Sequence, residues 1–114
     1  MVDDEAATRE LLRLHLANRG YHVLAAEDAV VAGHLVVTEK PDLVIVDVRM
    51  PYMDGYEFVA ALKSDPDTRE IPVVFLTTDH KVASEADRLG AAAYLLKPIV
   101  AERLLEVVSL FVDG

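Results

Sequence analysis

Short aliphatic runs alternate along the chain with segments in which apolar residues recur every three or four positions. The runs cover residues 1–2, 21–26, 43–46, 72–77 and 92–96, and most have the length and β-branched content of buried strands. Each is followed by a segment with helical spacing, so the pattern predicts five strands that alternate with five helices. This alternation favours a parallel sheet with helices on both faces and right-handed crossovers.

The helical segments carry recognisable ends. Gly20 closes the first, Asp28 has the side chain of an N-cap for residues 29–39, and Pro41 ends that second helix. The second helix is rich in valine, so packing rather than intrinsic propensity must hold it. In the first helix we expect an inward stripe of Ala7, Leu11 and Leu14, widened by Leu12 and Leu16.

Polar side chains follow the predicted strands at the edge where the carboxyl ends of the strands would meet. Asp3 and Asp4 follow the first run, Asp47 follows the third, Thr77 ends the fourth and Lys97 follows the fifth. Ligand sites of open α/β sheets lie at this edge. Clustered carboxylates repel and raise one another's pKa, and a divalent cation removes that repulsion. Oxygen ligands in a half-open site suit Mg²⁺, which keeps waters and accepts a phosphoryl oxygen.

Such a site would form a pocket for a dianionic phosphoryl group. Lys97 would neutralise the group and Thr77 would donate a hydrogen bond to it. Asp47 is then the candidate nucleophile, which would form an aspartyl-phosphate. Positioning and charge neutralisation would supply the catalysis.

Five motifs follow one another along nearly the whole chain. They are Val-Asp-Asp-Glu at 2–5, Pro-Asp-Leu-Val-Ile-Val-Asp at 41–47, Met-Pro-Tyr-Met-Asp-Gly at 50–55, Ile-Pro-Val-Val-Phe-Leu-Thr at 71–77 and Lys-Pro at 97–98. Together, at this spacing, they resemble the receiver domain of bacterial two-component response regulators. The resemblance implies a three-layer, doubly wound (βα)5 fold with the flavodoxin-like strand order 2-1-3-4-5. It also implies that residues 1–114 form a single receiver domain.

The resemblance assigns the metal and the phosphoryl group to particular residues. Asp47 would accept the phosphoryl group from a phosphohistidine of a sensor histidine kinase or of a histidine phosphotransfer protein, and Lys97 would neutralise it. Asp4, Asp47 and the backbone carbonyl of Arg49 would bind Mg²⁺, with Asp3 acting mainly through water.

The resemblance also implies a switch. Thr77 would move toward the phosphoryl group, the amide of Thr78 would donate to it, and the aromatic ring of Tyr94 would turn inward. The Lys97-Pro98 peptide bond would be cis. The helix that begins at Val82, the last strand and the last helix would form the output face for a downstream protein or a fused output domain.

Composition limits the classes of function. A chain of 114 residues suffices for one domain with a single core, and a hydrophobic share of 53% argues against disorder. No apolar run reaches the roughly 18 residues that span a bilayer, and nothing marks secretion. The absence of cysteine fits the cytoplasm. A net charge of −9 disfavours direct binding to nucleic acid or to an anionic membrane.

Other interpretations of the site stay open. A pseudo-receiver, which keeps the fold as an interaction module without phosphorylation, is the main alternative, although all the polar residues of the site are present. A phosphatase of the haloacid dehalogenase type needs a second acid two residues after the nucleophile, where this chain has Arg49. A flavodoxin is disfavoured because the loop after the first run is acidic. We therefore expect a signalling switch that dephosphorylates itself and not a turnover enzyme.

One departure from the family pattern and one pair of charged residues lead to further expectations. The first run is much shorter than an ordinary strand, which suggests a truncated or misassigned start and weak anchoring of Asp3 and Asp4. Arg49 and Asp79 lie two residues after Asp47 and Thr77 respectively, at the mouth of the site. They would form either an ion pair that shields the aspartyl-phosphate from water or two solvated charges.

Overall fold

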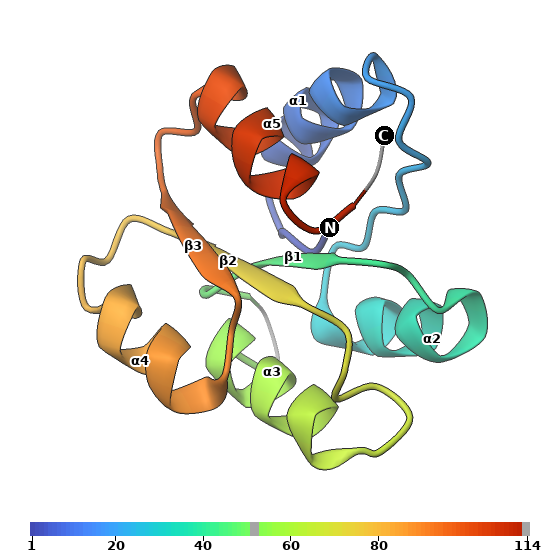
Figure 1. The fold of residues 1–114 in the computed structure, drawn as a ribbon, viewed down its shortest axis with the longest axis vertical. Coiled ribbons are helices and arrows are strands. Elements are labelled where there is room, and N and C mark those ends of the chain that lie inside the picture. Colours follow the sequence, from blue (N-terminus) through green and yellow to red (C-terminus); the bar gives the residue numbers. More distant parts are fainter. Residues whose placement is uncertain (51–52, 113–114) are drawn as a thin grey trace.

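The computed structural model describes residues 1–50 and 53–112 and has a three-layer α/β architecture (Figure 1). The helices are α1 (Ala6–Ala17), α2 (Ala29–Glu39), α3 (Gly55–Ser64), α4 (Val82–Leu89) and α5 (Ala101–Ser109), and the strands are β1 (Val44–Asp47), β2 (Val73–Thr77) and β3 (Ala93–Leu96). Helices α1 and α5 cover one face of the sheet, and α2, α3 and α4 cover the other. The predicted α/β class is confirmed. Pro51 and Tyr52 of the predicted loop motif lie outside the described residues.

The sheet is parallel, with β1 paired to β2 and β2 paired to β3. Val2 extends it beyond β1, because Val2 forms parallel bridges with Val46 on one side and with Ala26 on the other. The order across the sheet is therefore Ala26, Val2, β1, β2, β3. This is the predicted order 2-1-3-4-5, in which the first and second positions are each occupied by a single bridge residue.

Of the predicted strand at residues 21–26, only Ala26 forms a bridge in the sheet, and residues 21–25 are not a strand. The neighbour of this segment in the sheet is residues 1–3, of which Met1 and Asp3 make three backbone hydrogen bonds to it. The Met1 ammonium donates to the Leu24 carbonyl at 2.7 Å, the Ala26 amide donates to the Met1 carbonyl at 2.9 Å, and the Asp3 amide donates to the Ala26 carbonyl at 3.1 Å. A strand needs a partner along its length, so the segment before Leu24 runs as irregular chain.

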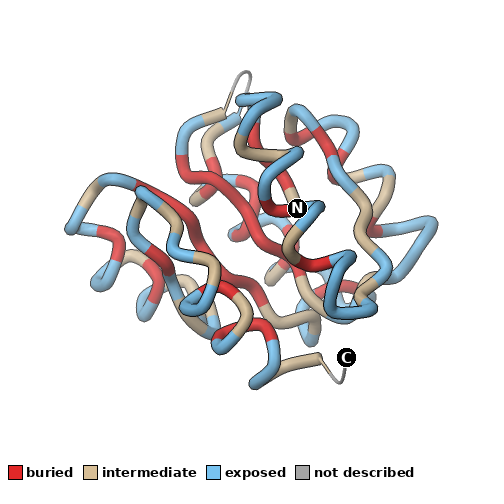
Figure 2. Tube along the Cα trace, turned by 90° about the horizontal axis from the view of Figure 1, so that it is seen from above, coloured by how far each residue is buried: buried red, intermediate tan, exposed pale blue. Residues whose placement is uncertain are grey.

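Alternate residues of each strand enter two separate hydrophobic cores. On β1, Val44 and Val46 pack into the core beneath α2, α3 and α4, whereas Ile45 packs into the core beneath α1 and α5. On β2, Phe75 belongs to the first core and Leu76 to the second. Successive strand residues point to opposite faces, so an uninterrupted apolar run fills both layers. Figure 2 shows the buried residues concentrated along the strands, with exposed residues on the outer sides of the helices.

Helix α1 presents a different face to the core from the predicted one. Leu12 and Leu16 are buried, whereas Leu11 and Leu14 are 46% and 48% exposed. The predicted stripe of Ala7, Leu11 and Leu14 is therefore wrong, and the two positions expected only to widen it are the core contacts. The helix carries leucine on adjacent faces, and only the face turned toward α5 and the sheet is covered.

Helix α2 is held by its cap and by small side chains. The Asp28 carboxylate accepts a hydrogen bond from the Val31 amide at 3.0 Å, which confirms the predicted N-cap.

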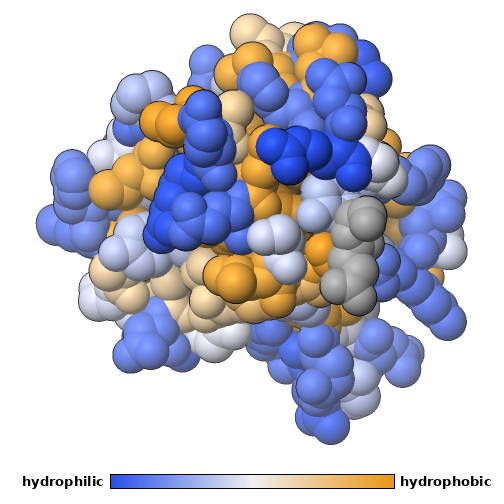
Figure 3. All heavy atoms as spheres, turned by 45° about the horizontal axis from the view of Figure 1, so that its top comes forward, coloured by the Kyte–Doolittle hydropathy of each residue, from blue (hydrophilic) through white to orange (hydrophobic). Residues whose placement is uncertain are grey.

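On the outer side of α2, Val30 and Val37 remain 72% and 63% exposed. Exposed apolar side chains occur elsewhere too, and Figure 3 shows them as separate patches among hydrophilic ones. Within the described residues, no helix combines the length and the hydropathy that a bilayer crossing requires.

Candidate functional site at the carboxyl edge of the sheet

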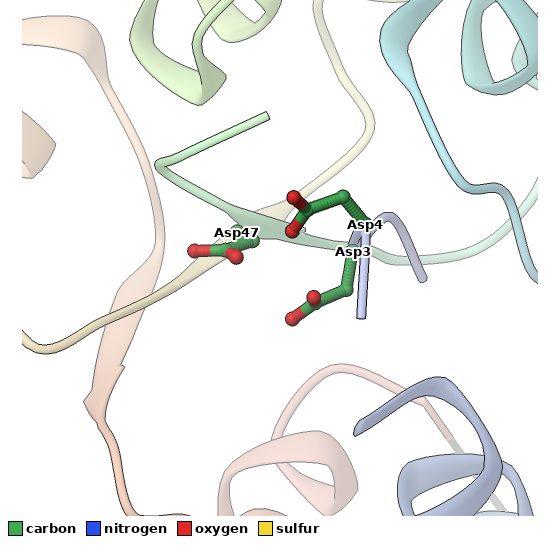
Figure 4. A group of neighbouring side chains, drawn as sticks. All are labelled: Asp3, Asp4 and Asp47. Carbon is green, nitrogen blue, oxygen red and sulfur yellow. The ribbon is translucent and has the colours of Figure 1, made fainter. Parts of the chain in front are cut away.

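Three carboxylates meet where β1 ends, beside the N-terminal segment (Figure 4). Asp3, Asp4 and Asp47 each offer an oxygen atom, and these atoms all lie within 4.8 Å of one another. Asp3 is fully buried and Asp47 is 5% exposed, whereas Asp4 is exposed. The structure thus brings Asp47 together with two acids that precede it in the sequence by more than forty positions.

Backbone hydrogen bonds hold these acids in place. The Asp47 amide donates to the Val2 carbonyl at 2.8 Å, and the Val2 amide donates to the Ile45 carbonyl at 2.7 Å. The Asp3 carboxylate accepts the Glu5 amide at 2.9 Å. The acidic pair is therefore tied directly to β1, although only one residue precedes it in the ladder.

The lysine from the far end of the sheet reaches the same cluster. Lys97 Nζ lies 3.1 Å from Asp3 Oδ2, 3.2 Å from Asp47 Oδ2 and 3.5 Å from Glu5 Oε1. The Lys97 amide donates to the Thr77 carbonyl at 2.8 Å, which continues the pairing of β2 with β3. The Lys97-Pro98 peptide bond is cis, as predicted. One ammonium group thus bridges the two buried acids.

The charges of the site are incompletely balanced. Burial raises the pKa of Asp47, and the neighbouring Asp3 carboxylate raises it further, while the Arg49 amide and Lys97 lower it in part. Burial by itself would lower the pKa of Lys97, but its hydrogen bonds and charge interactions with Asp3 and Asp47 outweigh burial and raise that pKa. Burial and the neighbouring Asp3 charge both disfavour the ionised form of Asp47, and a bound cation would favour that form.

The predicted switch and phosphoryl-contacting residues are placed as follows. Thr77 is buried at the end of β2, and its hydroxyl accepts the Asp79 amide at 3.0 Å. Thr78 is exposed, and Tyr94 on β3 is 40% exposed. The Arg49 amide donates to Asp47 Oδ1 at 3.3 Å. The roles assigned to Thr78, Tyr94 and the Arg49 carbonyl stay predictions.

The Arg49–Asp79 ion pair is absent from the salt bridges of the described residues. Instead the Asp79 carboxylate accepts the Lys81 amide at 2.9 Å, just before α4. This geometry favours the alternative of solvated charges at the mouth of the site.

Two residues of the site were missed by sequence reasoning. Glu5 shares Lys97 with the buried acids, and its place directly after the acidic pair was the available signal. Gly55 packs against β1, where its amide donates to the Val48 carbonyl at 2.7 Å. The motif that contains Gly55 was recognised, but not this contact.

The donor set fits Mg²⁺. Its side-chain oxygens are hard ligands, one of the three acids is open to solvent, and Lys97 brings a single positive charge to a cluster of three carboxylates. A half-open site of this kind leaves room for water or a phosphoryl oxygen.

Comparison with known proteins identifies the family and agrees with the fold. The family described as "Response regulator receiver domain" matches residues 1–109. The chain therefore belongs to the response regulator receiver domain family. Receiver domains generally bind Mg²⁺ at an acidic cluster, and Asp3, Asp4 and Asp47 form such a cluster here.

Individual relatives extend this result. Response regulator MprA of Mycobacterium sp. (strain KMS) is 41% identical over 107 residues, which are 92% of this chain and 46% of that protein. The chain thus spans about half the length of the curated relatives it matches. Chemotaxis protein CheY4 of Vibrio cholerae superimposes with a TM-score of 0.90 at 32% identity, over 97% of this chain and 94% of that one. The signal receiver domain of a signal transduction histidine kinase from Syntrophus aciditrophicus superimposes with a TM-score of 0.87 at 33% identity, over 96% of this chain and 85% of that one.

Proposed function

We propose that this receiver domain is a phosphorylation-dependent switch in which the Asp47 carboxylate accepts a phosphoryl group. The observation that carries this proposal is the position of Lys97 Nζ, 3.2 Å from Asp47 Oδ2 inside a cluster that also holds Asp3 and Asp4. As an Asp47 oxygen bonds to phosphorus, the bond from phosphorus to the donor's nitrogen or oxygen breaks. Lys97 then pairs with the transferred group in place of the carboxylate.

Magnesium would be held by the carboxylates of Asp4 and Asp47 and the carbonyl of Arg49, with Asp3 acting through water. When bound, the ion neutralises charge and draws in a phosphoryl oxygen. Asp3 holds Lys97 at the other edge of the site, and the Arg49 amide orients the Asp47 carboxylate. Asp4 lies on the exposed face of the cluster, and solvent and the phosphoryl donor would approach from this face.

Phosphorylation would be read out on the face formed by α4, β3 and α5. The Thr77 hydroxyl turns to a phosphoryl oxygen, the Thr78 amide donates to it, and Tyr94 leaves its exposed position for an inward one. The two arrangements differ in population and not in fold. Hydrolysis of the aspartyl-phosphate by water would then return the domain to its starting state. The domain would thus switch between two states and would not be a turnover enzyme.

The partners follow from the family. The phosphoryl donor would be a sensor histidine kinase or a histidine phosphotransfer protein. The phosphorylated domain would act on a downstream protein or a fused output domain, and we expect all of these in the cytoplasm. The net charge of −9 supports protein partners over nucleic acid or membrane contact by this domain.

Acetyl phosphate with Mg²⁺, followed by intact-mass measurement, tests the proposal. We expect one added phosphoryl group on the parent chain and none on Asp47→Asn or after Mg²⁺ is chelated. A parent chain whose mass does not change with either acetyl phosphate or a phosphorylated kinase would support the pseudo-receiver alternative and overturn this proposal.

A further inference from the structure

Tyr56 on α3 has a buried hydroxyl that lacks a hydrogen-bond partner among the described residues. Its ring packs edge-on against Phe75 of β2, with centroids 5.2 Å apart and an angle of 74° between the planes. Most buried hydroxyl groups in native proteins are hydrogen-bonded, and an unsatisfied one destabilises the arrangement that contains it. The structure therefore holds an unused donor at the junction of α3, β2 and α4.

The segment that carries Asp79 lies beside this donor, because α3 packs against α4, Tyr56 packs on the core cluster that contains Val82, and the Val82 amide donates to the Asp79 carbonyl at 3.2 Å. Burial raises the pKa of Tyr56, and the carboxylates of Asp79, Glu85 and Asp54 raise it further, in that order. Each carboxylate already has one partner in this arrangement. Glu85 pairs with Arg88 on α4, the Asp54 carboxylate accepts the Glu57 amide at 2.8 Å, and Asp79 Oδ1 accepts the Lys81 amide.

Asp79 differs from the other two because its position depends on the switch threonine. The Thr77 hydroxyl accepts the Asp79 amide at 3.0 Å and so fixes the start of the segment between β2 and α4. When the Thr77 hydroxyl turns toward a phosphoryl group on Asp47, this hydrogen bond is lost and Asp79 becomes free to move. Glu85 lies within α4 and Asp54 is the N-cap of α3, and the hydrogen bond from the Asp79 amide to the Thr77 hydroxyl holds neither of them.

We propose that the Tyr56 hydroxyl is a latch for the active arrangement, in which it donates a hydrogen bond to the Asp79 carboxylate that Thr77 releases. The proposal rests on the phosphoacceptor function of Asp47 and adds a positioning residue to it. The inactive form keeps an unsatisfied hydroxyl and the active form satisfies it, so the latch shifts the equilibrium toward the active form. It also couples α3, beside the phosphoacceptor, to the segment that leads into α4.

The test measures binding of beryllium trifluoride, an analogue of the phosphoryl group, to the full chain in excess Mg²⁺ by titration calorimetry. We expect Tyr56→Phe to weaken the apparent affinity about tenfold, because the binding-competent arrangement loses one hydrogen bond to a carboxylate. Asp79→Ala keeps the backbone amide and removes the acceptor, so it weakens binding as well. We expect the double variant to bind beryllium trifluoride as tightly as the single variant with the lower affinity, because both changes remove the same interaction.

Two readouts separate the latch from a merely structural role. Tyr21→Phe is the matched control, since the Tyr21 hydroxyl donates to the Val112 carbonyl at 3.3 Å, away from the site, and its loss leaves the affinity unchanged. The free energy of unfolding of ligand-free Tyr56→Phe equals or exceeds that of the parent, because an unsatisfied hydroxyl has been removed.

The outcomes distinguish the latch from the function on which it rests. An affinity of Tyr56→Phe within twofold of the parent overturns the latch and leaves the phosphoacceptor function standing. Effects that simply add in the double variant do the same. Binding that is no stronger in the parent than in Asp47→Asn overturns both.

Discussion

Gly55 lies so close to Asp47 that a Cβ atom on Gly55 would stand 2.4 Å from the Asp47 carbonyl oxygen and 2.8 Å from the Val48 Cα atom. Both contacts are with backbone, which cannot rotate away as a side chain can. The first residue of α3 is therefore packed directly against the chain that carries the phosphoacceptor. Glycine at this position is a requirement of close approach, not of a special backbone angle.

Gly55→Ala should accordingly destabilise the protein by about 1–3 kcal/mol, the usual range for overpacking, and should slow phosphorylation by displacing Asp47. Gly33→Ala is the matched control, because a Cβ atom there meets nothing within 4 Å and the residue lies inside α2. That control should be more stable than the parent by about 0.5–1 kcal/mol. Denaturant unfolding of both variants checks the pair, and equal stabilities would contradict the close contact.

The raised pKa of Asp47 predicts an unusual pH dependence. In Mg²⁺-free solution the unfolded chain loses the Asp47 proton near pH 3.8, the ordinary value, while the folded chain holds it to higher pH. The unfolded state is thus favoured as the pH rises through that interval, and the effect levels off above the folded pKa. Each pKa unit of elevation corresponds to about 1.4 kcal/mol.

Asp47→Asn removes this ionisation. Its stability advantage over the parent should grow as the pH rises from about 4 and then become constant, and Mg²⁺ should reduce it. Unfolding free energies across pH 3.5–8, with and without Mg²⁺, provide the measurement. A variant that is less stable than the parent at neutral pH without Mg²⁺ would contradict the excess charge assigned to the cluster.

Lys97→Met leaves two buried carboxylates without their shared cation. We expect a loss of about 3 kcal/mol in Mg²⁺-free solution, because an uncompensated charge remains in the interior. Added Mg²⁺ should recover much of that loss. Lys63→Met is the control, since Lys63 Nζ donates to the carbonyls of Arg69 and Ile71, at 3.0 Å each, and makes no salt bridge among the described residues. Chemical denaturation that shows the same Mg²⁺ response in both variants would count against the arrangement.

The phase of α1 can be tested with two adjacent leucines. Leu12 is fully buried and Leu11 is 46% exposed. Leu12→Ala should cost about 2–5 kcal/mol through lost burial and the cavity it leaves, whereas Leu11→Ala should change stability by no more than about 1 kcal/mol. The two variants remove the same atoms from the same helix, so thermal unfolding compares burial alone. A reversed order would restore the predicted stripe.

The sequence was sufficient to place the candidate site because parallel strands map chain order onto geometry. Asp47, Thr77 and Lys97 each end or follow a strand, and the carboxyl ends of parallel strands share one edge. No knowledge of side-chain contacts was needed to expect them together. Residues 29–39 were likewise predicted with the bounds that the structure has, since Asp28 and Pro41 mark the two ends of that helix, and the predicted start of α4 at Val82 is also confirmed.

Other features depend on packing that sequence patterns do not encode. Two overlapping leucine stripes on α1 satisfy the same helical period, and only the position of α5 decides between them. The run at 21–26 has strand composition, but its pairing is limited by the length of its neighbour. The contact between Glu5 and Lys97 joins residues 92 positions apart and required the folded chain.

The bridge at Val2 couples local opening of the sheet to the placement of the candidate metal ligands Asp3 and Asp4. A single rung of the ladder keeps Asp3 and Asp4 in register with Asp47, so fraying of that rung would separate the carboxylates that would hold Mg²⁺ before the rest of the sheet is disturbed. Amide exchange at this residue and magnesium titration should therefore report one and the same opening event, and protection there should rise in step with metal occupancy.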